Sequence, residues 1–457
     1  MNTTIFKAYD VRGLVPDELD SESARAIGAG FSRFVGGETI VVGRDMRSSS
    51  LELSEAFIEG ANAVGVSAIR IGLCSTDLLY FASGKLNLPA VMFTASHNPA
   101  QYNGIKMCRA SAGPISMDTG LAEIEALAEE FQRSPANRGV APVRNTDRDM
   151  LGEYVDHVRS FVDLSVMRPL RIVADTANGM GGLVVPAVFE ALGFDLDLMY
   201  GDLDGTFPNH PADPIQPENL VDLKARVLSR GADIGLAFDG DADRVFLVDD
   251  EAAPVSGSTT TALVASEMLR RYPGATILYN LICSKAVPEI ISELGGVPIR
   301  TRVGHSFIKA TMAESGAIFG GEHSGHYYFR DNYRADSGLI ASMFVLSVLS
   351  GTSDRLSQVR VPFERYAASG EVNTKVKDVA SVLDFIQNAY GDRANIDQLD
   401  GLTVDFGDWW FNVRPSNTEP LLRLNLEAKS SSEVAVRVHE VLAVISKADE
   451  KTMQGEE

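Results

Sequence analysis

The chain has 457 residues, 45% of them apolar and 23% charged, so it can form about three domains with buried cores. Its net charge of −21 argues against binding to nucleic acids or anionic membranes, because both need surfaces rich in lysine and arginine. Cys74, Cys108 and Cys283 are too few and too scattered for a disulfide framework, which favours a reducing compartment. No signal-peptide core is present near Lys7, and the longest apolar stretch, residues 339–349, is too short to span a bilayer. We therefore expect a cytoplasmic protein.

Short apolar runs alternate with segments of helical period over most of the chain. The runs that we predict as strands include residues 39–42, 170–174, 234–238 and 276–279. The amphipathic stretches that we predict as helices include residues 54–64 and 186–192. Strands that alternate with helices indicate βαβ units and mostly parallel sheets, which bind ligands at the carboxyl ends of the strands.

The pattern changes near Val361, after which strand-like segments precede one last helix. Ser430 and Glu433 form a capping-box pattern at the start of that helix, and we expect the charged tail after Lys447 to fray. The predicted fold class is α/β, with three similar α/β modules and a C-terminal α+β domain. We place these four domains at residues 1–148, 149–250, 251–362 and 363–457.

Two segments of the first module are candidates for a site. Tyr9 and Arg12 could lie in a cleft, or could belong to a plain first strand and turn. Ser96 lies in a polar loop, residues 94–99 (the serine loop), directly after the apolar run 89–93, and Lys106 follows beyond a turn. A hydroxyl at the end of a buried strand, with a cation nearby, suits a residue that accepts and returns a group.

Three carboxylates alternate with small residues in the acidic loop, residues 239–244, after the predicted strand 234–238. In an extended loop, Asp239, Asp241 and Asp243 point to one side, where their repulsion is costly unless a cation neutralises it. Hard oxygen ligands suit Mg²⁺. An EF-hand is excluded because Arg244 stands where that loop needs glycine. The remaining alternative is a solvated acidic turn.

Two later loops have the composition of recognition sites. The sugar loop, residues 320–326, is rich in glycine, and its Glu322 and Ser324 can bond to vicinal hydroxyls; the alternative is an ordinary turn. The phosphate loop, residues 414–420, combines the Arg414 guanidinium with hydroxyl, amide and backbone donors, although its residues are also common in turns.

Together these loops resemble one family, the α-D-phosphohexomutases, over essentially the whole chain. The resemblance covers Thr94-Ala-Ser-His-Asn-Pro99, Asp239-Gly-Asp-Ala-Asp-Arg244, Gly321-Glu-His-Ser-Gly-His326 and Arg414-Pro-Ser-Asn-Thr418, in that order. It implies four domains around a central cleft. Many relatives have a basic residue where this chain has Ile282, and that basic residue contacts the sugar phosphate. In this chain Lys285 or Arg302 could make the contact instead.

The resemblance also implies a mechanism. Ser96 would carry a phosphoryl group that completes a Mg²⁺ site with Asp239, Asp241 and Asp243, and a hexose 1,6-bisphosphate would be intermediate and activator. Lys106 is the candidate for the proton of the attacking hydroxyl. The other residues implied in catalysis are His97, Arg244 and His326. The residues implied in substrate binding are Tyr9, Arg12, Gly304, His305, Glu322, Ser324, Arg414, Ser416, Asn417 and Thr418.

The implied activity is the interconversion of mannose 6-phosphate and mannose 1-phosphate, because Glu322-His-Ser-Gly-His326 resembles the phosphomannomutase branch. The alternatives are a phosphoglucomutase or a dual phosphomannomutase/phosphoglucomutase. A phosphoglucosamine mutase, a Mg²⁺-dependent phosphatase and a non-catalytic sugar-phosphate-binding protein are weaker alternatives.

Overall fold

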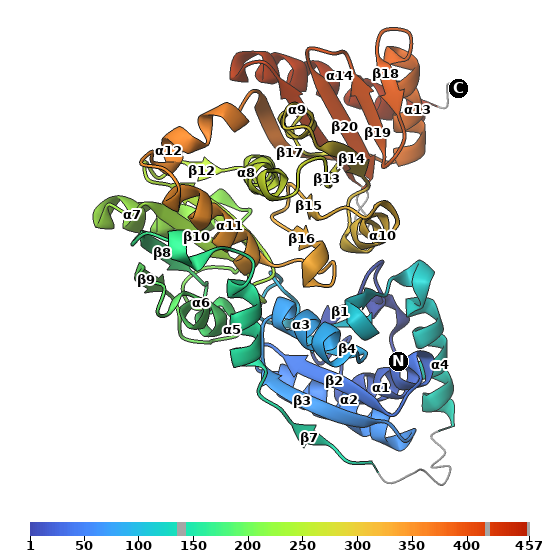
Figure 1. The fold of residues 1–457 in the computed structure, drawn as a ribbon. Coiled ribbons are helices and arrows are strands. Elements are labelled where there is room, and N and C mark those ends of the chain that lie inside the picture. The colour runs from blue at the N-terminus through green and yellow to red at the C-terminus, as the bar shows by residue number, and fades with distance from the viewer. Residues whose placement is uncertain (135–142, 416–420, 455–457) are drawn as a thin grey trace.

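The structure, a computed structural model, describes residues 1–134, 143–415 and 421–454. Within these residues the chain forms four sheets, which succeed one another from the blue N-terminal end to the red C-terminal end of Figure 1. None of the helices in these residues has both the length and the apolar character needed to cross a bilayer.

The first sheet has the strand order β1-β5-β4-β2-β3-β7, with β6 paired to β5. Its central strands β2, β3 and β4 are parallel, and β5 returns antiparallel beside β4. Because all four residues of β4 are buried, this strand fixes the start of the serine loop. The elements of this module are β1 (Val11–Leu14), α1 (Ser21–Val35), β2 (Thr39–Arg44), α2 (Ser50–Ala63), β3 (Ser67–Leu73), α3 (Thr76–Leu86), β4 (Ala90–Phe93), β5 (Tyr102–Arg109), β6 (Gly113–Pro114), α4 (Leu121–Arg133) and β7 (Thr146–Asp147).

The second sheet has the order β12-β11-β10-β8-β9, in which β8, β9 and β10 are parallel. The fully buried β10 coincides with the strand expected at residues 234–238. The helix expected at residues 186–192 begins earlier, at Gly181, with Pro186 inside it. The elements are α5 (Leu151–Arg159), β8 (Arg171–Asp175), α6 (Gly181–Phe189), β9 (Asp195–Met199), α7 (Val221–Arg230), β10 (Ile234–Phe238), β11 (Val245–Asp249) and β12 (Pro254–Val255). Because β12 pairs with β11, this sheet extends past residue 250.

The third sheet has the order β14-β13-β15-β16, and β13 is parallel to both of its neighbours. Helix α11, whose residues are almost all buried, packs against α8 and also against α5 and β11 of the second module. The elements are α8 (Gly257–Arg271), β13 (Thr276–Asn280), α9 (Ala286–Glu293), β14 (Val297–Thr301), α10 (His305–Ser315), β15 (Phe319–Gly321), β16 (Tyr327–Phe329), α11 (Gly338–Ser350) and α12 (Leu356–Val359).

The fourth sheet is antiparallel, with the order β17-β21-β20-β19-β18. Its elements are β17 (Ala367–Lys375), α13 (Val379–Tyr390), β18 (Asn395–Asp397), β19 (Leu402–Asp405), β20 (Trp410–Pro415), β21 (Leu421–Ala428) and α14 (Ser431–Gln454). Ser430 Oγ accepts a hydrogen bond from the Glu433 N–H (3.3 Å), as half of the expected capping box. The tail expected to fray after Lys447 is instead helical as far as Gln454, where α14 ends, and its last three residues lie outside the described ones.

The three α/β modules share one apolar cluster, although the first module also has a cluster of its own, and the fourth domain has a separate core. One apolar cluster runs from Val41 of the first module to Leu356 of the third. A separate cluster, built around Phe411 and Leu424, fills the fourth domain. Polar contacts join this domain to the third module, including Tyr366 Oη to Glu289 (2.6 Å). A domain with its own core can move as a unit.

A buried carboxylate ties the first three modules together. Asp77, on α3, accepts hydrogen bonds from Tyr154 Oη of α5 (2.5 Å), from Ser337 Oγ before α11 (2.6 Å) and from Ser75 Oγ. Burial raises the pKa of Asp77 to about 6, although these hydrogen bonds oppose the rise. Between about pH 4 and about pH 6, the folded protein therefore retains a proton on Asp77 that the unfolded chain has released.

This retained proton makes a prediction about stability. Between about pH 4 and about pH 6 the folded state binds more protons at Asp77, so stability falls with rising pH across that range, by at most about 3 kcal/mol. Asp77→Asn cannot ionise, so its melting temperature is expected to rise relative to the parent protein as the pH increases from 4 to 7. Parallel melting profiles for the two proteins would contradict this, and the exposed Asp331→Asn serves as the control.

Candidate active site

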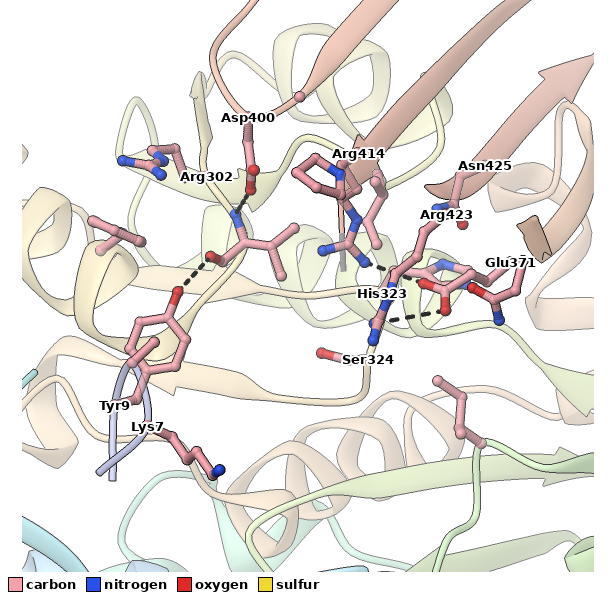
Figure 2. Close-up of a pocket in the computed structure, with 18 of the residues that line it drawn as sticks. Lys7, Tyr9, Arg302, His323, Ser324, Glu371, Asp400, Arg414, Arg423 and Asn425 are labelled. Atoms are coloured by element: carbon pink, nitrogen blue, oxygen red, sulfur yellow. Dashed lines mark hydrogen bonds and ion pairs between the residues drawn. The ribbon is translucent and has the colours of Figure 1, made fainter. Parts of the chain in front are cut away.

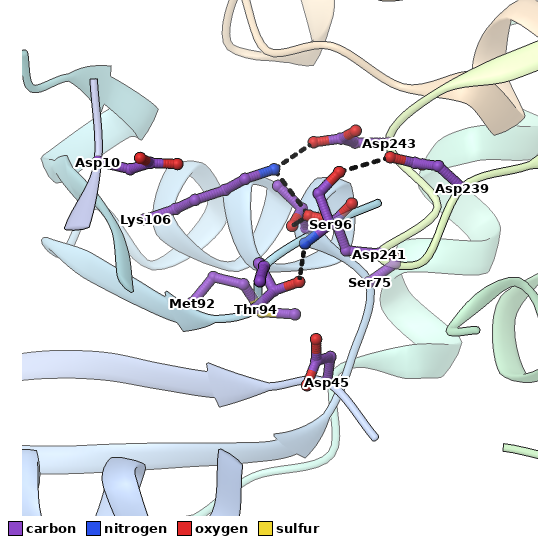
Figure 3. A network of polar contacts seen from close by, with 12 residues as sticks. Asp10, Asp45, Ser75, Met92, Thr94, Ser96, Lys106, Asp239, Asp241 and Asp243 are labelled. Atoms are coloured by element: carbon purple, nitrogen blue, oxygen red, sulfur yellow. Dashed lines mark hydrogen bonds and ion pairs between the residues drawn. The ribbon is translucent and has the colours of Figure 1, made fainter. Parts of the chain in front are cut away.

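The serine loop and the acidic loop meet at the carboxyl ends of β4 and β10 (Figure 3). A Cβ atom on Gly240 would lie 2.3 Å from the Ser96 carbonyl oxygen, so only glycine permits this approach. Two segments that are far apart in sequence thus lie together at the sheet edges where ligands bind in α/β proteins.

Ser96 faces the first aspartate of the acidic loop. It has a left-handed backbone conformation (φ 49°), and its N–H donates to Thr94 Oγ1 (2.9 Å). Its Oγ donates to Asp239 Oδ2 (2.7 Å) and accepts from Arg244 Nη2 (3.3 Å). A hydroxyl fixed by both a carboxylate and a guanidinium is held in one orientation beside charged groups.

Arg47 stabilises the serine loop through hydrogen bonds to its backbone, a role that the sequence did not predict. Its buried guanidinium donates to the carbonyl oxygens of Ser96 (2.9 Å), Asn98 (2.7 Å), Pro99 (2.8 Å) and Tyr102 (3.0 Å). Its Nε lies 3.2 Å from Asp45 Oδ2. One side chain therefore satisfies four carbonyl groups and fixes the course of the loop.

The acidic loop forms a buried cluster that fits a divalent cation. One carboxylate oxygen from each of Asp239, Asp241 and Asp243 lies within 4.8 Å of the others. The Oδ1 atoms of Asp241 and Asp243 are buried and have no hydrogen-bond partner among the described residues. Unpartnered oxygens on clustered, buried carboxylates suit a hard cation such as Mg²⁺.

Lys106, on β5 beside β4, reaches this cluster from the first module, whereas the three aspartates come from the second (Figure 3). Its Nζ donates to Asp241 Oδ2 and to Asp243 Oδ2, both at 2.7 Å. Burial opposes its charge, but the two carboxylates raise the pKa of Lys106 well above its usual value. Burial also opposes ionisation of Asp241, yet Lys106 holds the pKa of Asp241 below its usual value.

The pKa values of Asp239 and His97 are shifted in opposite directions. Burial raises the pKa of Asp239 to about 7, although the Arg244 charge opposes the rise. The same Arg244 charge, together with burial, lowers the pKa of His97 well below its usual value. His97 is therefore neutral, and its Nδ1 accepts a hydrogen bond from Arg244 Nη2 (2.5 Å). Arg244 thereby connects His97, Ser96 and Asp239.

His326, at the end of the sugar loop, also lies next to the acidic loop. Its Nδ1 is 2.7 Å from Asp336 Oδ2 and 3.9 Å from Asp243 Oδ1. Burial opposes protonation, but the bond to Asp336 and the charge of Asp243 raise the pKa of His326. Lys309 Nζ lies 3.4 Å from the other oxygen of Asp336. No sequence motif pointed to Asp336 or Lys309, because tertiary packing alone brings them to the loop.

Glu322 and Ser324 of the sugar loop differ in accessibility. Ser324 lines the large cavity described below, together with His323. Glu322 is buried, and its carboxylate accepts from Tyr328 Oη (2.7 Å), the Gly304 N–H (3.2 Å) and Asn280 Nδ2 (3.4 Å). Glu322 therefore fixes the segment at residue 304 as well as its own loop.

Gly304 allows Tyr9 to approach this segment. It has a φ of 126°, and a Cβ atom at this position would lie 2.6 Å from Tyr9 Oη. The Tyr9 ring contacts the His305 ring edge-on at 5.2 Å and lines the cavity. Arg12 instead binds the serine loop, through Ala95 O (3.3 Å) and Asn98 Oδ1 (2.5 Å).

A cavity of about 1700 Å³ lies in front of these groups and takes walls from all four domains (Figure 2). His97, Arg244 and Ser324 line it, and so does Arg414 of the phosphate loop. Arg414 Nη2 lies 3.2 Å from Glu371 Oε2, and Arg423 Nη1 lies 3.6 Å from Glu371 Oε1. The expected site residues Ser416, Asn417 and Thr418 lie outside the described residues.

Lys285 and Arg302, the two candidates for the basic residue that relatives have at position 282, have different surroundings. Lys285 Nζ binds Asp405 Oδ1 (2.6 Å) and the Gly407 carbonyl oxygen (2.9 Å) of the fourth domain. Arg302 lines the cavity together with Ile282, and its guanidinium stacks on the Phe307 ring at 4.2 Å.

Fold and site together define a class: a four-domain α/β protein with a hydroxyl, a carboxylate cluster and several guanidinium groups around one interdomain cavity. The four domain models of the phosphoglucomutase/phosphomannomutase family match residues 3–134 (domain I), 152–252 (domain II), 256–366 (domain III) and 371–444 (C-terminal domain). The chain therefore belongs to the phosphoglucomutase/phosphomannomutase family, and is an enzyme of the phosphotransferase isomerase type. This confirms the family and the four-domain α/β architecture expected from the sequence.

Relatives match over nearly the whole chain. A protein of Xanthomonas campestris pv. campestris named "Phosphohexose mutases" is 38% identical, with 94% of this chain and 96% of the relative covered. A phosphomannomutase of Escherichia coli K12 is 37% identical, with 93% and 95% covered. The crystal structure of a phosphoglucomutase/phosphomannomutase family protein from Burkholderia thailandensis superposes with a TM-score of 0.90 at 33% identity, covering 98% of each chain.

Proposed function

We propose that the protein is a Mg²⁺-dependent phosphomannomutase that interconverts mannose 6-phosphate and mannose 1-phosphate. The observation that carries this proposal is the 2.7 Å contact between Ser96 Oγ and Asp239 Oδ2, at a carboxylate cluster beside the cavity. Relatives named phosphomannomutase, including the protein of Escherichia coli K12, favour mannose as the substrate sugar.

Asp239, Asp241 and Asp243 would hold the Mg²⁺, together with a phosphoryl oxygen on Ser96. Bound Mg²⁺ supplies charge that polarises the phosphoryl group and offsets negative charge on the serine oxygen. Arg244 and His97 are placed to hold phosphoryl oxygens, because both line the cavity next to Ser96.

The first transfer moves the phosphoryl group from Ser96 to the sugar. The bond between Ser96 Oγ and phosphorus breaks while a sugar hydroxyl oxygen forms a new bond to phosphorus. Lys106 would accept the proton of that hydroxyl after its own ammonium proton has passed to solvent, because a bound Mg²⁺ would take up the two carboxylates that now stabilise the ammonium charge. His326, held by Asp336, is the second acid–base candidate.

The resulting hexose 1,6-bisphosphate must turn round before the second transfer returns a phosphoryl group to Ser96. The sugar loop, through Ser324 and Glu322, and the phosphate loop, through Arg414 and residues 416–418, are proposed to hold it in both orientations. The separate core of the fourth domain suits an opening motion that allows this turn. Three buried, free cysteines fit action in the cytoplasm.

The substrate test compares kcat/KM for mannose 1-phosphate and glucose 1-phosphate, with Mg²⁺ and glucose 1,6-bisphosphate present. We expect kcat/KM for mannose 1-phosphate to equal or exceed the value for glucose 1-phosphate. A preference for glucose 1-phosphate of about tenfold would instead identify a phosphoglucomutase. Stoichiometric release of inorganic phosphate would identify a phosphatase. If neither sugar phosphate is turned over, the protein is a non-catalytic binding protein.

A further inference from the structure

We infer that Arg302 binds the phosphate that is not being transferred and so sets the affinity for hexose phosphates. This inference rests on the proposed function, since it concerns the phosphorylated end of the substrate that lies away from Ser96. Arg302 and the apolar Ile282 both belong to the third domain, and both line the cavity.

The strand register places Arg302 at the ligand-binding edge of the third sheet. Parallel strands β13 and β14 pair Asn280 with Thr301, and the Leu281 N–H donates to the Thr301 carbonyl oxygen (3.0 Å). Arg302 is the next residue after β14, so it leaves the sheet beside Leu281 and Ile282. The carboxyl ends of parallel strands are where α/β sheets bind ligands.

Arg302 differs from the other arginines that line the cavity, although Lys7 also lines it and its ammonium bonds only to the Thr4 carbonyl oxygen among the described residues. Arg244 is paired with Asp239, and Arg414 with Glu371. Arg302 forms no ion pair with any residue in the described part of the chain. It is exposed, and Figure 2 shows it on the side of the pocket opposite Lys7.

The surroundings of Arg302 suit a phosphate. Its guanidinium lies over the Phe307 ring at 4.2 Å, which orients the plane and leaves the N–H edge free to donate. Four carboxylates also line the cavity: Asp118, Asp213, Glu371 and Asp400. In such an acidic cavity an anionic ligand needs a cation that is not already neutralised, and the fork of an arginine matches phosphate oxygens.

The test measures KM and kcat of Arg302→Gln, with the parent protein assayed alongside. We expect KM to rise about 10- to 100-fold for both mannose 1-phosphate and mannose 6-phosphate, with little change in kcat, since the contact is equal in ground and transition states. The control, Arg330→Gln, removes an exposed arginine of the same domain that is paired with Asp331, and its KM should not change.

Two further variants separate a phosphate contact from a structural role. Arg302→Lys keeps the charge, and Ile282→Lys in the Arg302→Gln background returns a cation to the adjacent strand end; both should recover part of the lost affinity. An unchanged KM in Arg302→Gln, or no recovery in either variant, would overturn the inference. A parent protein without mutase activity would instead contradict the proposed function.

Discussion

Ser96→Ala is expected to lower mutase turnover by at least about 10⁴-fold while the protein stays folded. The hydroxyl is the atom proposed to carry the phosphoryl group, and alanine offers no oxygen to replace it. Folding should survive because Asp239 keeps its 2.8 Å pair with Arg244 Nε. The measurement combines a coupled mutase assay with circular dichroism and a thermal melt.

Ser111→Ala is the matched control for this variant. Ser111 has a similar left-handed backbone (φ 58°) but bonds to Asn87 on the surface, so its loss should leave turnover unchanged. Near-normal turnover in a folded Ser96→Ala protein would remove Ser96 from the mechanism.

Asp241→Asn should have the next largest effect, through the metal. The Oδ1 atom of Asp241 is buried without a hydrogen-bond partner among the described residues, so the position fits a ligand. Removing its charge should weaken Mg²⁺ binding by at least about 100-fold, because even residues that only support metal ligands change affinity by up to that factor. Titration calorimetry with MgCl₂ measures this affinity, and the mutase rate should then require far more Mg²⁺.

Asp250→Asn is the control, because it removes the charge of a half-buried aspartate outside the cluster. Asp250 follows β11 and binds Ser357, so its replacement can lower stability but should leave the Mg²⁺ requirement unchanged. If the parent protein works equally well in EDTA and in Mg²⁺, the acidic loop holds no catalytic metal.

Local patterns in the sequence predicted much of the fold because the decisive strands are buried on both faces. The apolar run at residues 234–238 corresponds to β10, and polar loops follow β4 and β10 as the rule for strand ends requires. The contact between Ser96 and Asp239 follows from two such strand ends. Helix boundaries were less predictable: α6 begins at Gly181, ahead of Pro186, because burial compensates for weak local signals.

The parts of the site that sequence reasoning missed depend on long-range packing. Arg47 is a single arginine after a strand until the serine loop folds around it. Asp336 becomes a partner of His326 only when residues 326–336 fold back beside the acidic loop. Likewise, the sequence offered Lys285 and Arg302 as equal candidates, and the placement of the fourth domain separates them, because Asp405 binds Lys285.

The most direct test of the phosphoryl-carrier role follows the phosphate on Ser96. The protein is incubated with glucose 1,6-bisphosphate and Mg²⁺, desalted, digested and analysed by mass spectrometry, with Ser96→Ala in parallel. We predict one phosphoryl group on the peptide that contains Ser96, its loss when mannose 6-phosphate is added, and an equal amount of mannose 1,6-bisphosphate formed. Mutase turnover without phosphate on Ser96, or with the phosphate on another residue, would contradict the role.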